Sequence, residues 1–245
     1  MKVVNDLVGY KNLNIVQDTD FFKFSLESVL LPNFVTINQK KLKILDVCTG
    51  NIPIPLILST RISDESKIYA IELQKEIYDL AVETTKINNL ESKITIINDD
   101  VKNLNRYFSA EYFDIITCNP PYFKVYDKSI LNKSDIKTIA RHEVKLDLET
   151  LISLSAKYLK NNGIFAMVHR TERMTEVLIL LHKYKLEPKR IKFIFPKRGT
   201  DSNLLMIECV KNGNPGLKKV EYIIIHDENG QYTEEVKKNF KWYMA

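Results

Sequence analysis

Cysteine, glycine and long apolar runs are scarce in this chain of 245 residues. The three cysteines, Cys48, Cys118 and Cys209, lie far apart and form no C-x-x-C pair, which argues against disulfides and structural zinc and favours a reducing compartment. The longest apolar stretches, such as Tyr222 to Ile225, are far too short to span a bilayer. The first residues also lack the apolar core of a secretion signal. We therefore expect a cytoplasmic protein without a membrane segment.

Composition fits one large domain, because 44% of the residues are hydrophobic and 27% are charged. We expect a single domain over 1–245, with a cap segment at 1–40, a core sheet at 41–212 and a C-terminal extension at 213–245. A monomer is the favoured state. The net charge of +5 permits an acidic partner such as nucleic acid but does not require one.

Short apolar runs rich in β-branched residues alternate with amphipathic segments. The runs are typical of buried strands and lie at 43–47, 67–72, 93–97, 113–118 and 163–168. Helical periodicity appears at 77–87, 148–159 and 174–184, with Gly163 as the stop signal of the second helix. This alternation predicts an α/β fold with a doubly wound, mostly parallel sheet.

The two ends of the chain depart from this pattern. Runs at 190–195 and 204–209 have no helix between them, which favours an antiparallel pair and completes a seven-stranded sheet with an antiparallel edge strand. Ahead of the sheet, Ser25 to Leu31 is predicted as a short helix that Pro32 stops.

Acidic residues follow the first three predicted strands, at the sheet edge where doubly wound folds bind ligands. Asp46 closes the first strand, Glu72 lies 22 residues after Gly50, and Asp100 follows the third strand. A glycine-bearing turn with an acidic strand end about 20 residues later is typical of a nucleoside site. A dinucleotide needs a glycine-rich helix N-terminus for its phosphates, so three acids and one glycine favour the cationic S-adenosylmethionine over NAD.

The fourth strand ends in Asn119-Pro120-Pro121-Tyr122. The prolines fix their own φ angles and lack N–H groups, so the segment is stiff and presents carbonyl oxygens. The Asn119 side-chain oxygen and the Pro120 carbonyl can accept both hydrogens of one amino group. That arrangement would favour a pyramidal nitrogen whose lone pair faces a methyl donor, while Tyr122 would stack on a base.

These segments resemble a known family. FDIITCNPPYFK resembles motif IV, and LDVCTGNIPIPL motif I, of class I S-adenosylmethionine-dependent amino-methyltransferases. More narrowly, FFKFSLESVLL, IARHE, VHRTERMTEVL, LEPKRIKFIFPK and DENGQYTEEV are similar to segments of the bacterial tRNA(Val) adenine-N(6) methyltransferases. The resemblance implies a Rossmann-like fold and methyl transfer to the exocyclic amine of the adenine 3′ of the anticodon.

The resemblance also implies roles for individual residues. Phe24 and Ser25 would border the methionine moiety of the cofactor, and Asp46 would face its ammonium group. Gly50 would let the backbone approach the cofactor closely. Glu72 would hold the ribose, and Asp100 would bind the amine of the cofactor's adenine. The full implied cofactor set is Phe24, Ser25, Asp46, Thr49, Gly50, Glu72, Leu73, Asp100, Val101 and Asn119. The implied catalytic set is Asn119, Pro120 and Tyr122. One departure is the turn after the first strand, where Cys48 and Ile52 stand in place of glycines.

Two basic regions are candidates for RNA binding. The polar segment 125–145 is predicted as a flap over the target base, and a disordered insertion is the alternative. The run from Lys183 to Arg198 holds seven basic residues and one acid, and a phosphate-contacting sheet edge is the favoured interpretation over a solvated surface. The predicted RNA-binding residues are Lys124, Arg141, His142, Lys189, Arg190, Lys197 and Arg198. His142 and His169 have no ligand-spaced partners, so no metal site is predicted.

Two other functions compete with a tRNA methyltransferase. A protein-glutamine methyltransferase could use the same NPPY site, but the segment ahead of the core is expected to be too short for an extra N-terminal helical domain. A catalytically silent RNA-binding protein would explain the altered glycine turn, but the intact NPPY motif argues against it.

Overall fold

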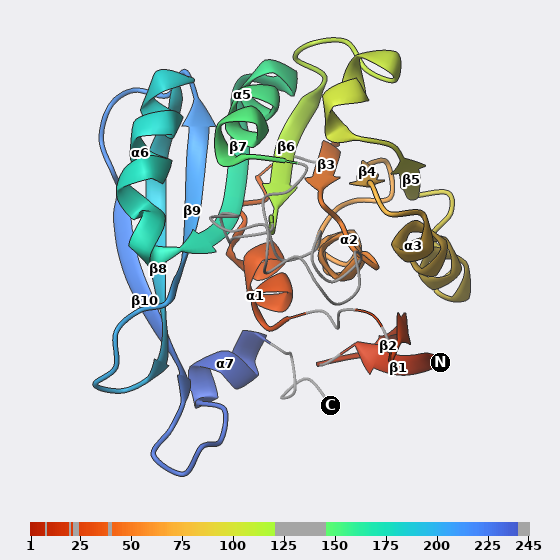
Figure 1. Cartoon of the computed structure of the whole chain (residues 1–245), viewed down its shortest axis with the longest axis horizontal. Helices are drawn as coiled ribbons and strands as arrows, with labels where there is room; N and C mark the ends of the chain where they lie inside the picture. Colours follow the sequence, from red (N-terminus) through yellow and green to blue (C-terminus); the bar gives the residue numbers. More distant parts are fainter. Residues whose placement is uncertain (8, 20, 22–24, 39–40, 121–145, 240–245) are drawn as a thin grey trace, which may run out of the picture.

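Eight strands form one sheet in the computed structural model, which describes residues 1–7, 9–19, 21, 25–38, 41–120 and 146–239. The strand order is β10-β8-β9-β7-β6-β3-β4-β5 (Figure 1). Their bounds are β3 Lys43–Val47, β4 Lys67–Glu72, β5 Ile94–Asn98, β6 Phe113–Cys118, β7 Leu159–Arg170, β8 Leu186–Lys197, β9 Leu204–Lys211 and β10 Lys219–His226. Among the described strands of this sheet, β9 alone runs antiparallel to its neighbours.

The central strands are apolar along their whole length because both of their faces are buried. Alternate residues belong to two separate cores, as the period of two along a strand requires. Ile44 and Ile115 pack into one core, whereas Leu45 and Ile116 pack into the other.

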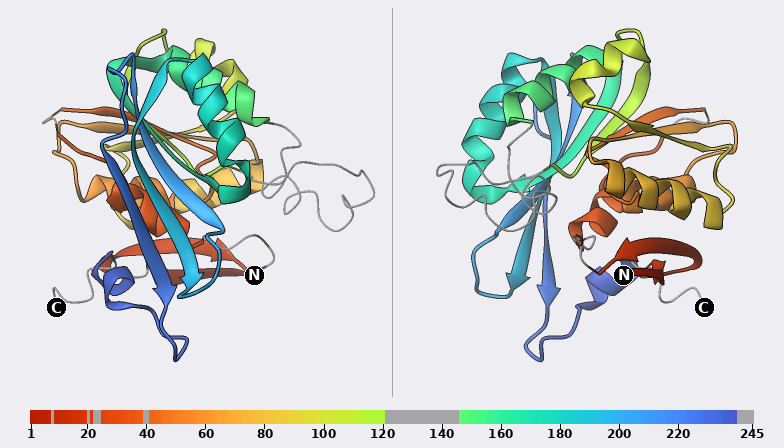
Figure 2. Two further views of the ribbon diagram at one scale, coloured as in Figure 1. Left: turned by 90° about the vertical axis from the view of Figure 1, so that its left-hand side faces the viewer. Right: turned by 45° about the vertical axis from the view of Figure 1, so that its right-hand side comes forward.

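Helices cover both faces of the sheet (Figures 1 and 2). Residues of α1 and α2 pack into the first core, and those of η1, α5 and α6 into the second. The bounds are α1 Glu27–Phe34, α2 Pro53–Ser59, α3 Lys75–Ile87, η1 Val101–Arg106, α5 Leu148–Tyr158, η3 Thr171–Arg173, α6 Met174–Lys183 and α7 Glu234–Asn239. No helix among the described residues is long and apolar enough to cross a membrane.

A two-stranded hairpin, β1 Lys2–Leu7 and β2 Tyr10–Asp18, precedes the sheet. The sequence patterns did not predict it. Its second strand is fixed to α3, where the Val16 N–H donates to Thr84 Oγ1 at 3.0 Å. The Val16 carbonyl also accepts from Asn51 Nδ2 at 2.9 Å, so the hairpin supports the turn that follows β3.

The predicted fold class is confirmed, with differences in detail. The β8–β9 pair is antiparallel as expected, but β9 lies inside the sheet, and β10 adds an eighth strand parallel to β8 at the edge. Helix α1 continues through Pro32 to Phe34 instead of stopping there, because both residues are buried in the first core region. Gly163 lies within β7, not at a helix end, and a Cβ there would meet the Leu159 side chain at 2.7 Å.

The strand order reverses direction between β3 and β6. From β3 the chain moves outward to β4 and β5 and then returns to place β6 on the other side of β3. Val47 and Cys118 are register partners at the carboxyl ends of these two strands. The residues that follow, Cys48 and Asn119, therefore leave the sheet side by side at the point where open α/β sheets bind ligands.

Candidate active site

The turn after β3 is tight because three of its residues adopt left-handed conformations. Cys48, Gly50 and Ile52 have φ angles of 56°, 59° and 65°, and only the glycine adopts this region without steric cost. The left-handed conformation costs roughly 1–2 kcal/mol at each of the other two residues, Cys48 and Ile52. Ile52 then caps α2, whose first residue is Pro53. Two positions with left-handed backbone thus carry Cys48 and Ile52, the residues that stand in place of glycines in the resemblance.

Glu72, at the end of β4, holds this turn in place. Its Oε2 accepts the Gly50 N–H and its Oε1 accepts the Gln74 N–H, both at 3.0 Å. Burial raises the pKa of the Glu72 carboxyl, and these backbone hydrogen bonds oppose the shift. Each carboxylate oxygen has two lone-pair directions, so the group can accept further donors beyond these two.

Asp46 lies beneath the turn and is completely buried. Its two oxygens accept the hydroxyl protons of Thr49 and Thr117, each at 2.6 Å. Burial raises its pKa to about 7, the two hydroxyls oppose the shift, and the nearby Glu72 adds to it. These two hydrogen bonds hold Thr49 and Thr117 against Asp46. The contact of Asp46 with the ammonium group of a cofactor stays a prediction.

The raised pKa of Asp46 predicts a pH-dependent stability. The folded state holds a proton on Asp46 up to about pH 7, whereas an aspartate in the unfolded chain has its ordinary pKa of 3.8. The free energy of unfolding therefore falls as pH rises between these two values. Asp46→Asn cannot ionise, so its thermal stability relative to wild type should rise from pH 5 to pH 8, by about 1–3 kcal/mol. Thermal unfolding at several pH values measures this, with the exposed Asp64→Asn as control. A difference from wild type that stays constant with pH would contradict the assignment.

Asn119 is tied to helix α1. Its side-chain Nδ2 donates to Ser28 Oγ at 2.9 Å, and Ser28 Oγ lies 3.4 Å from Ser25 Oγ. Because the amide nitrogen faces Ser28, the amide oxygen faces the other way. The structure thus brings the predicted residues Ser25 and Asn119 together through Ser28, a residue that sequence reasoning missed. Its position inside the family-like segment FFKFSLESVLL was the available signal.

The end of β5 supplies the far wall of this region. Asp100 caps η1, and its Oδ1 accepts the Lys102 N–H at 2.9 Å. Val101 is buried behind it, whereas Leu73 is 38% exposed after β4. Asn98 Nδ2 donates to the carbonyls of Glu72 and Leu73 at 2.9 and 3.2 Å, which joins the ends of β4 and β5.

Several predicted residues lie outside the residues that the structure describes. These are Phe24, Tyr122, Lys124, Arg141 and His142. Among the described residues, no three His, Cys, Asp or Glu side chains cluster as a metal site.

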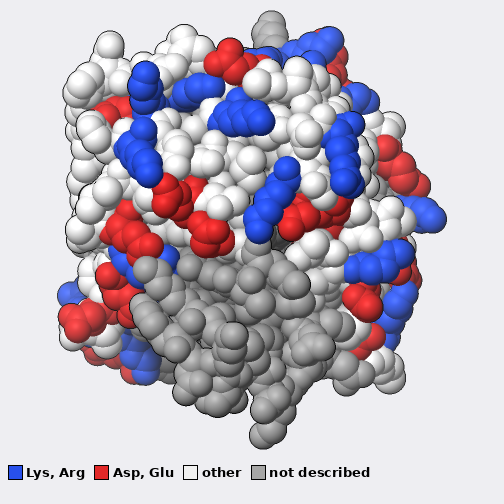
Figure 3. All heavy atoms as spheres, turned by 45° about the horizontal axis from the view of Figure 1, so that its top comes forward, with Lys and Arg blue, Asp and Glu red and all other residues white. Residues whose placement is uncertain are grey.

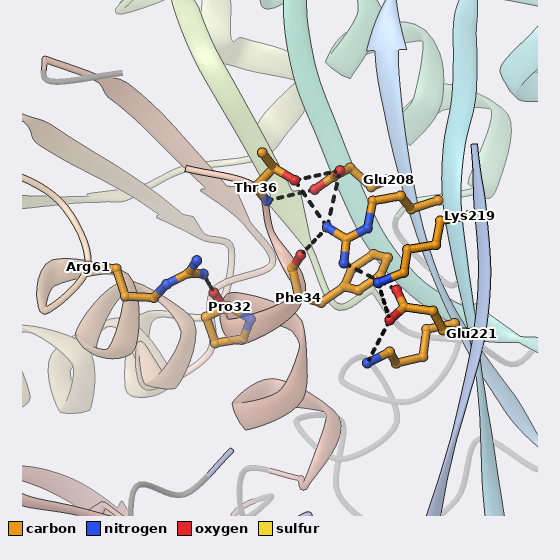
Figure 4. Close-up of polar contacts among 9 residues, drawn as sticks. Pro32, Phe34, Thr36, Arg61, Glu208, Lys219 and Glu221 are labelled. Carbon is orange, nitrogen blue, oxygen red and sulfur yellow. Dashed lines mark hydrogen bonds and ion pairs between the residues drawn. The ribbon is translucent and has the colours of Figure 1, made fainter. Parts of the chain in front are cut away.

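Arg190 does not have the open phosphate-binding position that was predicted for it. Its guanidinium donates to the Phe34 carbonyl at 2.9 Å and to Thr36 Oγ1 at 3.0 Å, and it pairs with Glu208 and Glu221 at 3.5 and 3.3 Å (Figure 4). It also lies over the Phe34 ring, 4.5 Å from the centroid. Arg190 therefore joins the end of α1 to the sheet.

The other predicted basic residues of this edge differ among themselves. Lys189 donates to the carbonyls of Asn214 and Gly216. Lys197 and Arg198 are exposed at the carboxyl end of β8. The face in Figure 3, where the top of Figure 1 comes forward, mixes basic and acidic side chains without a surface of one sign.

The chain is similar in sequence to bacterial tRNA methyltransferases over most of its length. The chain is 26% identical over 226 residues to the tRNA1(Val) (adenine(37)-N6)-methyltransferase of Tolumonas auensis, covering 92% of this chain and 91% of that protein. It is also 26% identical to the protein of that name from Bacteroides thetaiotaomicron, covering 98% of both chains.

Solved methyltransferase structures share the fold. A predicted O-methyltransferase from Agrobacterium tumefaciens matches with a TM-score of 0.68 at 17% identity, covering 87% of this chain and 96% of that one. The tRNA m1G37 methyltransferase of M. jannaschii matches with a TM-score of 0.60 at 15% identity, covering 87% of this chain and 57% of that one.

A family model matches the part of the chain that contains most of the candidate site residues. The model of the methyltransferase small domain matches residues 27–187, more than half of the chain. That range begins at α1, which carries Ser28, and includes the β3 turn, the ends of β4 and β5, and Asn119. The sequence-based assignment to the methyltransferases is confirmed, and the chain belongs to the methyltransferase small domain family.

Proposed function

We propose that this protein transfers a methyl group from S-adenosylmethionine to the exocyclic amine of an adenine in tRNA, the adenine 3′ of the anticodon of tRNA(Val). The observation that carries the proposal is the register of β3 and β6, in which Val47 and Cys118 are partners. Adjacent strands lie about 4.8 Å apart. The turn after β3, which could bind a nucleoside, therefore lies next to Asn119, which could bind an amine. The resemblance and the names of the relatives support the choice of tRNA, and this substrate implies a cytoplasmic protein.

The residues of the β3 turn fit S-adenosylmethionine. Glu72 and Asp46 are two buried carboxyl groups, and the charge of Glu72 adds to the burial that raises the pKa of Asp46. A cationic ligand would relieve that repulsion, whereas a phosphate would add to it. Bound there, S-adenosylmethionine would supply an electrophilic methyl group. Glu72 would accept ribose hydroxyls, and Asp100 would accept the amine of the cofactor's adenine.

Asn119 and Pro120 would prepare the target amine. The amine of adenine is conjugated with its ring and is a poor nucleophile. If the Asn119 oxygen and the Pro120 carbonyl accept its two hydrogens, the lone pair is freed to face the methyl donor. Ser28 holds the Asn119 amide by its nitrogen, which fixes the oxygen as the acceptor that faces the substrate. This arrangement needs positioned acceptors and no general base with a shifted pKa.

The direct test is methyl transfer from labelled S-adenosylmethionine to unmodified total tRNA, followed by nucleoside analysis. The proposal expects label in N6-methyladenosine. Label in protein glutamine instead would favour a protein-glutamine methyltransferase. Cofactor binding with no transfer to any RNA or protein would favour a silent RNA-binding protein.

The salt dependence of tRNA binding tests the basic edge. Lys197 and Arg198 have no acidic partner among the described residues, so we expect them to contact phosphates. Each lost phosphate contact lowers the salt slope by about 0.9, so Lys197→Glu with Arg198→Glu should flatten the slope by about two units for all tRNAs alike. Lys86→Glu on the exposed face of α3 is the control. Equal salt slopes for the double variant and wild type would show a merely solvated surface.

A further inference from the structure

The edge strand β10 presents two unlike faces. On one face, Glu221 pairs with Arg190, Lys192 and Lys219 at 2.8–3.8 Å. The opposite face carries an apolar row formed by Val220, Tyr222 and Ile224. Edge strands are usually protected by charged residues or proline, so an open apolar row on one face indicates a binding surface.

This row forms one wall of a groove of about 500 Å³. Figure 2 shows, in its left view, that β8 and β10 extend past the end of α6, which leaves this part of the sheet without a covering helix. The groove is lined by Phe193, Phe195, Lys197, Arg198, Gly199, Thr200, Val220, Glu221, Tyr222 and Ile224. Its volume is in the range of sites that hold a small molecule.

Aromatic rings stand at the centre of the groove. Tyr222 is 65% exposed and Val220 is 61% exposed. Phe195 meets Tyr222 edge to face, with ring centroids 6.3 Å apart and an interplanar angle of 88°. Because an edge-to-face contact covers at most one face of a ring, Phe195 leaves at least one face of the Tyr222 ring uncovered. Single exposed apolar residues are ordinary, but a contiguous aromatic patch marks an interaction site.

Two cations stand at the rim of the groove. The turn after β8 presents Lys197 and Arg198, and it is fixed by Thr200, whose Oγ1 donates to the Lys197 carbonyl at 2.8 Å. Neither cation has an acidic partner in the part of the chain that the structure describes. Stacking faces beside unneutralised cations are the combination that binds unpaired nucleotides.

The groove is at the same edge of the sheet as Asn119. Strands β6, β8 and β10 run parallel, so their carboxyl ends share one edge. Three to four strand spacings separate β6 from the groove across the sheet, roughly 14–19 Å. Along the strands, Cys118 is level with Ile191 of β8, so the groove residues from Phe193 to Lys197 lie roughly 3–17 Å beyond Asn119. The combined separation is roughly 15–25 Å, which corresponds to roughly four to seven stacked nucleotides at a rise of about 3.4 Å each.

We propose that this groove binds an unpaired nucleotide of the RNA substrate, with its base against Tyr222 and Phe195 and its phosphate on Lys197 and Arg198. The inference rests on the proposed tRNA methyltransferase function and adds a second contact point outside the reacting base. The bound nucleotide lies roughly four to seven positions from the methylated adenine. Charge complementarity favours RNA over a second copy of this chain or another protein, because the rim cations would be buried unpaired against an apolar surface.

The test is equilibrium binding of tRNA without cofactor by wild type, Tyr222→Ala and Tyr222→Phe. We expect Tyr222→Ala to bind about fivefold more weakly, and Tyr222→Phe to stay within about twofold of wild type, because the ring face supplies the contact. Tyr107→Ala, at an exposed tyrosine beyond the opposite edge of the sheet, is the matched control. A scan of abasic nucleotides through the anticodon loop should find one position that weakens wild type but not Tyr222→Ala.

Each other outcome overturns the inference in a recognisable way. If wild type binds tRNA and Tyr222→Ala binds it equally well, the groove is not an RNA site, and the proposed function stands. If Tyr222→Ala leaves RNA binding unchanged but alters the sedimentation of the protein, the face is an interface between copies. If wild type binds no tRNA, both the groove and the proposed function are wrong.

Discussion

Replacing Asn119 by alanine should lower the rate of methyl transfer about 100-fold, by analogy with the loss of one preorganised polar group. The amide oxygen is expected to hold the target amine as its nitrogen becomes nucleophilic, so the loss should fall on kcat and not on the affinity for tRNA. Single-turnover kinetics with saturating tRNA and cofactor measure the effect.

Variants of Ser28 test whether the orientation of the Asn119 side chain contributes to the rate of methyl transfer. Ser28→Ala removes the acceptor of the Asn119 Nδ2 hydrogen bond, so it should lower kcat by a smaller factor, about 3- to 10-fold, with Ser28→Thr partly restoring it. Asn161→Ala, at an exposed position of β7, should behave as wild type. If Asn119→Ala transfers methyl groups at the wild-type rate, the NPPY stretch is only a stiff end to β6.

The fold was predictable where burial dictates the residue types. Strands β3, β4, β6 and β7 are largely apolar because they are covered on both faces, and this pattern is visible without a structure. The hairpin β1–β2 was missed because its residues are mixed in polarity, and its strands are ordered by α3 and by the β3 turn. Strand β10 was not predicted although Tyr222 to Ile225 is an apolar run, because its parallel pairing with β8 depends on contacts between segments far apart in the sequence.

The sequence predicted which residues lie at the strand ends of the site, but not the side chains that hydrogen-bond to them. Asp46, Glu72 and Asn119 follow strands, and parallel strands end at one edge. The hydroxyls of Thr117 and Ser28, which hold Asp46 and Asn119, come from register and helix placement that no local pattern reports. Their roles required the structure.

The basic run shows a second limit of sequence reasoning. Along a strand, neighbours face opposite sides. Arg190 and Lys192 face Glu221 and are neutralised there, while Lys197 at the end of β8 and Arg198 directly after it stay exposed. A charge count over the segment cannot separate these two groups, because it contains no information on the acids of the adjoining strands.

Replacing Glu72 by alanine should weaken S-adenosylmethionine binding about tenfold or more. The carboxylate is expected to accept ribose hydroxyls, and hydrogen bonds to a charged group contribute about 1.5–3 kcal/mol each. It also accepts the Gly50 N–H, so its loss releases a turn that already holds two left-handed residues that are not glycine. Both effects act in the same direction. Calorimetric titration with the cofactor measures the change.

Glu72→Gln separates the two contributions. The glutamine oxygen can still accept the Gly50 N–H and keep the turn, but the negative charge and one acceptor oxygen are lost, so its affinity should lie between wild type and Glu72→Ala. Glu76→Ala, an exposed acid in the first turn of α3, should bind the cofactor as wild type does, which excludes a general effect of net charge. Because Glu72 is nearly buried, thermal unfolding of each variant must first show a folded protein. Unchanged cofactor affinity in a folded Glu72→Ala would remove this carboxylate from the site and leave it as a support of the turn alone.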